Sequence, residues 1–304
     1  MRNINLYNIK KWYKMLNGTS ILHVKQGSGQ HYSNTEIKGY YNDLTEKVLR
    51  DEEHDNLRIP SFKLENGEII IFPIAVFQYG LGSYDLYLKN KEELYKNKFS
   101  LMVDWAVSNQ DKDGSWNNFF YIYPNAPFSA MAQGEGASLL IRAYKEFGEY
   151  KYLECAKKAI DFMLKSVDSG GTTSYKGQEV FLQEFTSKPT VLNGWIFAIF
   201  GLYDYVKVTE DERAKQILWQ TLSTLENNLY KFDNGYWSMY NMDGIITSSF
   251  YHELHIAQLF VLYDLFEIDE FKKYYDKWNG YKEKWSNGKR AFLLKAYQKL
   301  TENI

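Results

Sequence analysis

The stretch FAIFGLYDYVKV, residues 197–208, recurs in altered form three more times along this chain of 304 residues. Each copy has a run of apolar residues, a short gap and a tyrosine, as in FQYGLGSYDLYL, ASLLIRAYKEFG and AQLFVLYDLFEI. The four tyrosines, Tyr84, Tyr144, Tyr203 and Tyr263, lie about 60 residues apart. A period of this length indicates a repeated unit of two helices.

The two helices of each repeat have different apolar patterns. In VLNGWIFAIFGLYDY, residues 191–205, apolar side chains cover most of the circumference, so we expect this helix to be buried on all sides. In ERAKQILWQTLSTLENNL, residues 212–229, they form a single stripe opposite the charged residues. Alternating inner and outer helices predict an all-α fold, an incomplete (α/α) barrel of about four helical hairpins.

Turn-rich segments follow three of the repeats: QDKDGSWNNFF, VDSGGTTSY and KFDNGYWSMYN. Their Asp-Gly, Gly-Gly and Asn-Gly pairs predict short β-hairpins, which we expect at the rim of the barrel's cavity. Residues 1–70 lack the repeat. We expect them to form an N-terminal arm, with a polar helix in LTEKVLRDEEHDNLR and a turn with a short strand in ENGEIIIFPI. This arm would pack on a barrel formed by residues 71–304.

Composition narrows the class of protein. The net charge of −2 provides no strong field to attract nucleic acid. Neither a membrane-spanning segment of about 20 apolar residues nor a secretory signal is visible, so we expect a soluble, cytoplasmic protein. The 26 tyrosines suit either a surface that stacks on sugars or a large helical core. Because dinucleotide, phosphate-loop and zinc motifs are missing, we expect no cofactor and no metal.

One acidic residue precedes an inner helix. Glu184 lies in FLQEFTSKPTVLNGW, residues 181–195, next to Phe185. Partial burial among apolar neighbours would raise the pKa of this carboxyl above its usual value of about 4.3 and make it a better base near neutral pH. The alternative is a carboxylate that interacts with a helix N-terminus.

Further polar residues are expected on the inner helices. The segment YHELH contains Tyr251, His252 and His255. Its His-x-x-His spacing would suit a metal, but without a third ligand nearby in the sequence a buried, hydrogen-bonded pair is favoured. Arg142 is the one cation of the apolar stretch LLIRAY, so it requires either a structural carboxylate or an anionic substrate as its partner.

Several blocks of this sequence resemble the C-terminal domain of the D-glucuronyl C5-epimerases, from about Phe72 to Trp285. They include FPIAVFQYGLGSYDLYL, PFSAMAQGEGASLLIRAY, VLNGWIFAIFGLYDY and FYHELHIAQL. The resemblance implies an incomplete (α/α) barrel and an epimerase that inverts C5 of a hexuronic acid within a glycan, from D-glucuronate to L-iduronate. The implied substrate is a heparosan-type, uronic-acid-containing polysaccharide. The implied reaction uses one group that removes the C5 proton, a second group that adds a proton to the opposite face, and no redox cofactor.

The resemblance also implies roles for individual residues. By motif position, Glu184 and Tyr251 correspond to the groups that flank C5, and Tyr240 corresponds to a third, hairpin tyrosine. The residues predicted to contact the substrate are Trp116, Gln133, Glu135, Arg142, Phe185, Asn193, His252 and His255.

This chain departs from the family pattern at two positions. Phe185 stands where the family commonly has tyrosine, and Asn241 follows Tyr240 where an arginine is expected. Two other functions therefore stay open: a uronate lyase, whose elimination begins with the same C5 carbanion, and a glycan-binding protein that has lost catalysis. By analogy with the animal enzymes, a homodimer is also expected.

Overall fold

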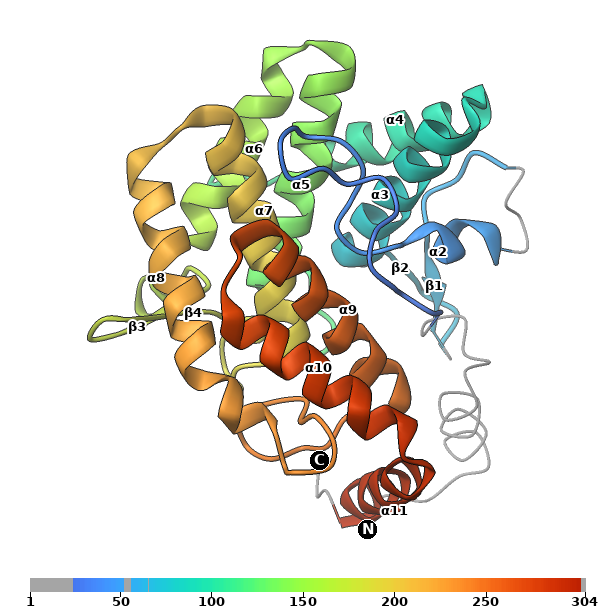
Figure 1. Ribbon diagram of the computed structural model, residues 1–304. Coiled ribbons are helices and arrows are strands. Elements are labelled where there is room, and N and C mark those ends of the chain that lie inside the picture. Colours follow the sequence, from blue (N-terminus) through green and yellow to red (C-terminus); the bar gives the residue numbers. More distant parts are fainter. Residues whose placement is uncertain (1–23, 52–55, 65, 302–304) are drawn as a thin grey trace. The chain divides into compact units, whose positions relative to one another are not determined.

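The computed structural model describes residues 24–51, 56–64 and 66–301 (Figure 1). Within them the chain is mostly helical, and its strands form two short antiparallel pairs, so the predicted all-α class is confirmed. The chain divides into two compact units. The large unit comprises Gly29–Asn227, and the small unit combines the described residues up to Ser28 with those from Asn228 onward. The domain boundary expected near residue 70 stays a prediction.

Three long helices form the centre of the large unit: α3 (Pro73–Asn90), α5 (Ala130–Phe147) and α7 (Leu192–Thr209). The helix α5 packs against both α3 and α7. Apart from their last turn, most residues of each helix are buried, because apolar or small side chains occupy every face. These are the inner helices expected from the repeat.

The outer helices of the large unit bury only one face. They are α4 (Glu93–Ser108), which packs on α3, α6 (Tyr150–Met163), which packs on α5, and α8 (Glu212–Asn228). The buried stripe of α8 consists of Ala214, Ile217, Leu218, Leu222 and Leu225. The expected difference between inner and outer helices is therefore present, whereas closure of the repeats into a barrel stays a prediction.

The small unit contains the fourth helix pair, α9 (Ser249–Phe266) and α10 (Asp269–Glu283), which pack against each other (Figure 1). A short 3-10 helix, Leu229–Phe232, precedes the turn segment that leads to α9. The chain leaves helical geometry at Lys284, and a further helix, α11 (Trp285–Thr301), follows.

The two strand pairs both belong to the large unit. β1 (Phe62–Lys63) pairs with β2 (Ile69–Ile70), as expected for the turn and strand in ENGEIIIFPI. β3 (Thr173–Lys176) and β4 (Glu179–Leu182) form a hairpin that begins in the second turn-rich segment. Its turn is at Gly177, with a φ of 62°, and not at the Gly-Gly pair on which the expectation rested.

The other turn segments form less regular structure. In the third segment only isolated bridges occur, Asp233 with Ser238 and Met239 with Ile246. Of the expected polar helix in residues 44–58, the helical part among the described residues is α2 (Thr45–Leu49). Residues 50, 51 and 56–58 are not helical, and residues 52–55 lie outside the described residues. None of the helices in the described ranges combines the length and apolarity that a membrane crossing needs.

The helices α5 and α7 approach each other through glycine. A Cβ atom on Gly134 would lie 2.7 Å from Cα of Ala198, and a Cβ on Gly201 would lie 2.5 Å from the carbonyl carbon of Gly134. Since real Cβ atoms do not tolerate such distances from backbone, the two backbones can touch only because these positions lack a side chain. This contact fixes how α5, at Gly134, is placed against the middle of α7.

Each inner helix ends at a residue in the left-handed conformation. The φ angles are 61° at Lys91, 73° at Gly148, 55° at Glu210 and 54° at Glu267. At the three residues other than glycine, the Cβ atom makes this conformation costly by about 1–2 kcal/mol. The shared ending shows that the repeat seen in the sequence is also a repeat of backbone geometry.

Exchanging residues at these helix ends tests that strain. Glu210→Gly removes the Cβ penalty and is expected to raise the free energy of unfolding by about 0.5–1 kcal/mol, less than the full penalty because glycine gains entropy in the unfolded chain. Gly148→Ala, at a site with open space around it, should lower it by about 1 kcal/mol. Urea denaturation measures both; changes of the same sign would contradict the interpretation.

Candidate active site

Glu184 lies where two inner helices begin. It follows β4, and the preceding residue, Gln183, accepts a hydrogen bond through its carbonyl from the backbone N–H of Ala130, the first residue of α5, at 2.8 Å. The Glu184 side chain packs on Gly194 in the first turn of α7, where an added Cβ would lie 2.6 Å from Cβ of Glu184 and would also collide with its carboxyl oxygen. The local sequence therefore holds this carboxylate at the N-terminal ends of α5 and α7.

The environment of Glu184 is dry. Glu184 is 7% exposed, and its Oε2 has no hydrogen-bond partner among the described residues. Burial raises the pKa of the Glu184 carboxyl to about 8, because the charged form loses its hydration. The N-terminal dipoles of α5 and α7 act in the opposite direction and favour the anion. A carboxyl with these properties can exchange a proton near neutral pH.

A second buried carboxyl, Glu135, lies on α5. Its Oε1 accepts a hydrogen bond from Nε2 of Gln78 at 2.7 Å, and its Oε2 has no partner among the described residues. Burial raises the pKa of Glu135 to about 8; the Gln78 hydrogen bond and the charge of Lys47 oppose this, and the charge of Glu184 adds to it. Burial lowers the pKa of Lys47 to about 8, with Glu135 opposing the shift. The charges of Glu184 and of the partly buried Lys47 therefore both act on the Glu135 carboxyl.

Gln133 and Trp116, both predicted substrate contacts, are engaged in packing. Nε2 of Gln133 donates to the carbonyls of Gly114 and Ala159 at 2.9 and 3.3 Å, and its Oε1 accepts from the backbone N–H of Trp116 at 3.0 Å. The Trp116 indole donates to the carbonyl of Ala106 and packs edge-on against a neighbouring phenylalanine. These contacts attach the loop before α5 to the core, and a substrate role for either residue stays a prediction.

Arg142 has a carboxylate partner within the core. Its Nη1 lies 2.6 Å from Oδ2 of Asp204, its Nη2 donates to the carbonyl of Gly39 at 2.9 Å, and its guanidinium lies over the rings of Tyr40 and Tyr41. The residue is 1% exposed. The sequence left open whether Arg142 pairs with a structural carboxylate or with an anionic substrate. In the structure its partner is the carboxylate of Asp204, and Arg142 lies in the core.

In the small unit, the structure brings together two of the residues predicted to be catalytic. Tyr251 lies in the first turn of α9, and Tyr240 lies on the preceding turn segment, held by a hydrogen bond from its N–H to the carbonyl of Ile245 at 2.6 Å. The two tyrosine rings meet edge to face, with centroids 5.1 Å apart and an interplanar angle of 67°. Both residues are only partly buried. Glu184 belongs to the large unit and this tyrosine pair to the small unit.

A buried network supports the tyrosine pair. Nδ1 of His252 accepts from the backbone N–H of Ser238 at 3.2 Å and lies 2.8 Å from its Oγ. Because the carbonyl of Trp278, 3.2 Å from Nε2, can only accept, Nε2 must carry the proton. Nδ1 of His255 lies 3.3 Å from the same Ser238 hydroxyl. Ser238 thus connects the segment that carries Tyr240 to the helix that carries Tyr251.

The two histidines form the buried, hydrogen-bonded pair favoured from the sequence. Burial lowers the pKa of His252 to about 3 and holds that of His255 well below its usual value, so both rings are neutral at physiological pH. In the described residues, no group of three or more His, Cys, Asp or Glu side chains is arranged to hold a metal ion. A direct substrate contact by either histidine stays a prediction.

The remaining predicted contacts flank Glu184. Asn193 is buried in the first turn of α7, and Phe185 is partly buried and stacks on Phe119 with centroids 4.4 Å apart. The sequence analysis missed the roles of Lys47 and Gln78. The apolar setting of α3 around Gln78 gave a signal for a buried amide that needs a partner, but nothing in the sequence connected Lys47 to Glu135.

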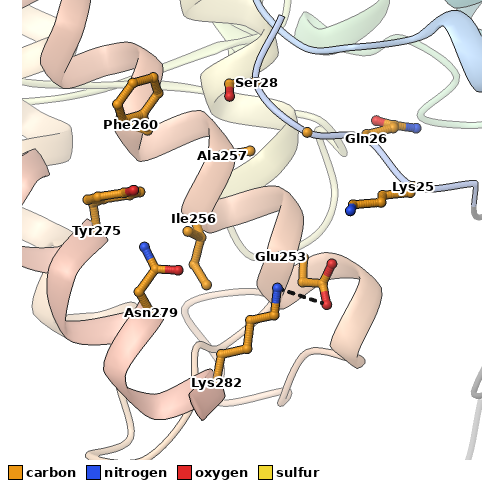
Figure 2. Close-up of a pocket in the computed structure, with 11 residues that line it drawn as sticks. Lys25, Gln26, Ser28, Glu253, Ile256, Ala257, Phe260, Tyr275, Asn279 and Lys282 are labelled. Atoms are coloured by element: carbon orange, nitrogen blue, oxygen red, sulfur yellow. Dashed lines mark ion pairs between the residues drawn. The ribbon is translucent and has the colours of Figure 1, made fainter.

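A pocket of about 250 Å³ in the small unit contains none of the predicted site residues (Figure 2). Helices α9 and α10 and residues 25–28 form its walls. Lys282 and Glu253 form an ion pair at 3.2 Å, and the rings of Phe260 and Tyr275 lie beside each other. Because its carboxylate is already paired, this pocket lacks the buried, unpartnered acid that distinguishes Glu184.

Comparison with known proteins identifies the family of this chain. The family model for the D-glucuronyl C5-epimerase C-terminus matches residues 110–280, a range that contains Glu184, Tyr240 and Tyr251. The chain is 27% identical to D-glucuronyl C5-epimerase of Caenorhabditis elegans over 234 residues, which are 67% of this chain and 37% of that protein. The chain therefore belongs to the D-glucuronyl C5-epimerase family, as the sequence resemblance implied.

Another relative is an uncharacterized protein of Methanocaldococcus jannaschii, 30% identical over 155 residues. This match covers 49% of the present chain and 50% of the archaeal protein. Both matches thus span half or less of the relatives' own length.

The buried carboxyls predict how stability depends on pH. Above pH ~4.5 the unfolded chain ionises these groups, whereas the folded chain keeps them protonated up to about pH 8. The free energy of unfolding should therefore fall as pH rises through this window, by up to about 1.4 kcal/mol per pH unit for each carboxyl. In Glu184→Gln and Glu135→Gln this dependence should be weaker, and each variant should gain most over the wild type near pH 8.

Urea denaturation at intervals between pH 5 and 8 measures this effect. Glu212→Gln, which changes a side chain that is 80% exposed, is the control and should follow the wild type. If both buried-site variants kept the wild-type pH dependence, the two carboxyls would not be protonated in the folded protein.

Proposed function

We propose that this protein is an epimerase that inverts C5 of a hexuronic acid in a glycan, converting D-glucuronate to L-iduronate. Family membership supports the class of reaction. The observation that carries the proposal is the buried Glu184 carboxyl, with a pKa raised to about 8 and an oxygen that no described residue engages. A base with a pKa near the working pH combines adequate proton affinity with a usable ionised fraction.

In the proposed reaction the ionised Glu184 removes the proton from C5. The electron pair of the C–H bond moves into the adjacent carboxylate of the sugar, which becomes an enediolate. The phenol of Tyr251 then delivers a proton to the opposite face of C5 as the electron pair returns. The cycle leaves Glu184 protonated and Tyr251 deprotonated, and exchange with solvent restores both groups.

The neighbours of each group fit its proposed task. The segment from Glu184 to Gly194 fixes the carboxyl next to two helix N-termini, where local dipoles stabilise developing negative charge. The ring of Tyr240 contacts that of Tyr251, which supports the proposal that Tyr240 orients the phenol. The pKa of Glu184 is raised by burial alone, so the proposal requires neither Glu135 to tune it nor Arg142 to contact the substrate.

Solvent deuterium tests this function. Heparosan-derived oligosaccharides, incubated with the protein in deuterated water, should acquire deuterium at C5, detected by mass spectrometry and by loss of the H5 proton resonance. Glu184→Gln and Tyr251→Phe should each slow this exchange by about 100- to 10,000-fold, the usual contribution of one general acid or base. Tyr150→Phe, at an exposed tyrosine of the large unit, should leave the rate unchanged.

Other outcomes identify the alternative functions. Release of an unsaturated sugar, measured by ultraviolet absorbance, would show a lyase that uses the same C5 carbanion. Glycan binding without any C5 exchange in the wild type would show a non-catalytic family member. Exchange at the wild-type rate in Glu184→Gln would contradict the assignment of the base.

A further inference from the structure

Three consecutive side chains in the loop before α5 are apolar and exposed. Phe120 is 39% exposed, Tyr121 is 46% exposed and Ile122 is 52% exposed. We call these three residues the aromatic ledge. Single exposed apolar side chains are normal, but a contiguous group of them marks a surface that binds something.

The loop that carries the ledge is held in shape by its own hydrogen bonds. The backbone N–H of Phe119 donates to the carbonyl of Pro127 at 2.7 Å and closes the loop. Within it, the N–H groups of Ile122 and Tyr123 both donate to the carbonyl of Phe119, at 3.0 and 2.7 Å. The side chain of Asn118 accepts from the N–H of Ile74 at the start of α3, which attaches the loop to the core. A surface held in this way binds with little loss of conformational entropy.

The base of the loop packs directly beside the candidate base. Phe119 stacks on Phe185, the residue after Glu184, with centroids 4.4 Å apart and an interplanar angle of 21°. Tyr123 meets the same Phe185 ring edge-on at 5.7 Å. The ammonium of Lys188 lies 5.4 Å from the centroid of the Tyr123 ring, so a positive charge lies beside the base of the loop. The ledge is therefore continuous, through Phe119 and Phe185, with the residues around Glu184.

We propose that the aromatic ledge is a sugar-binding subsite, which holds a residue of the glycan next to the uronate that reacts. This inference rests on the proposed function, because it takes the substrate to be a polymer that extends beyond Glu184. Aromatic faces attract the partly positive C–H groups on the face of a pyranose ring, and Lys188 would pair with a uronate carboxylate farther along the chain.

The size of the ledge favours a sugar chain over a protein partner. Three side chains provide far less area than the roughly 800 Å² per partner of a specific protein–protein interface. One or two pyranose rings match the two aromatic side chains of the ledge. The continuity with Phe185 explains why such a surface would lie here and not elsewhere on the large unit.

The test compares oligosaccharides of two lengths. Tyr121→Ala should raise the dissociation constant for a heparosan hexasaccharide by about tenfold, as expected for the loss of one aromatic contact, and should change that for methyl glucuronoside little. Tyr121→Phe keeps the ring and should restore binding. Tyr150→Ala, which removes a tyrosine that is 63% exposed on α6, is the matched control. Calorimetry measures binding, and C5 exchange measures KM and kcat separately.

The outcomes separate this inference from the proposed function. A raised KM for the hexasaccharide at unchanged kcat supports both, whereas C5 exchange with an unchanged KM and dissociation constant in Tyr121→Ala overturns the ledge alone. Hexasaccharide binding that depends on Tyr121 without any C5 exchange supports the ledge and overturns the epimerase. A wild type that binds no uronate glycan overturns both. If Tyr121→Ala instead dissociates a dimer in light scattering and leaves glycan affinity unchanged, the ledge is an interface between copies and the proposal is wrong.

Discussion

The close contact between the backbones of α5 and α7 is the constraint on which the candidate site depends. Gly134 and Gly201 allow this contact, and Gly194 in the first turn of α7 leaves room for the side chain of Glu184. A larger residue at Gly194 would displace the carboxyl from the position that the chain gives it. Because Glu184 is buried where its side chain packs on Gly194, its carboxyl loses its hydration, and its pKa rises. Packing and proton affinity at this site therefore have one cause.

The repeat was predictable from the sequence because it depends on the spacing of apolar residues within each helix. Apolar residues on every face of residues 191–205, and one apolar stripe in residues 212–229, depend only on helical spacing, and the helices α7 and α8 follow them. The position of Glu184 at the entry to α7 was predictable for the same reason, since a turn at Pro189 and an apolar run mark a helix start.

Long-range pairing was not predictable from those patterns. Arg142 needed an anionic partner, but only the fold shows that Asp204, far along the chain, supplies it. Gln133 and Trp116 were predicted to contact the substrate, yet they bond to the backbone of the core. The coupling of Lys47 to Glu135 joins a short arm helix to α5, and a one-dimensional pattern contains no sign of it. The break at Lys284 has no sign in the sequence, because helical residues continue on both sides of it.

The account depends most on the protonation of Glu184, which nuclear magnetic resonance can follow directly. The protein would be labelled with carbon-13 at its glutamate carboxyl groups, and the signal of Glu184 identified by its loss in Glu184→Gln. Burial at the first turns of α5 and α7 predicts that this signal titrates with a midpoint near pH 8. A midpoint near 4.5, as for a carboxyl in water, would contradict the dry site and leave Glu184 an ordinary surface acid.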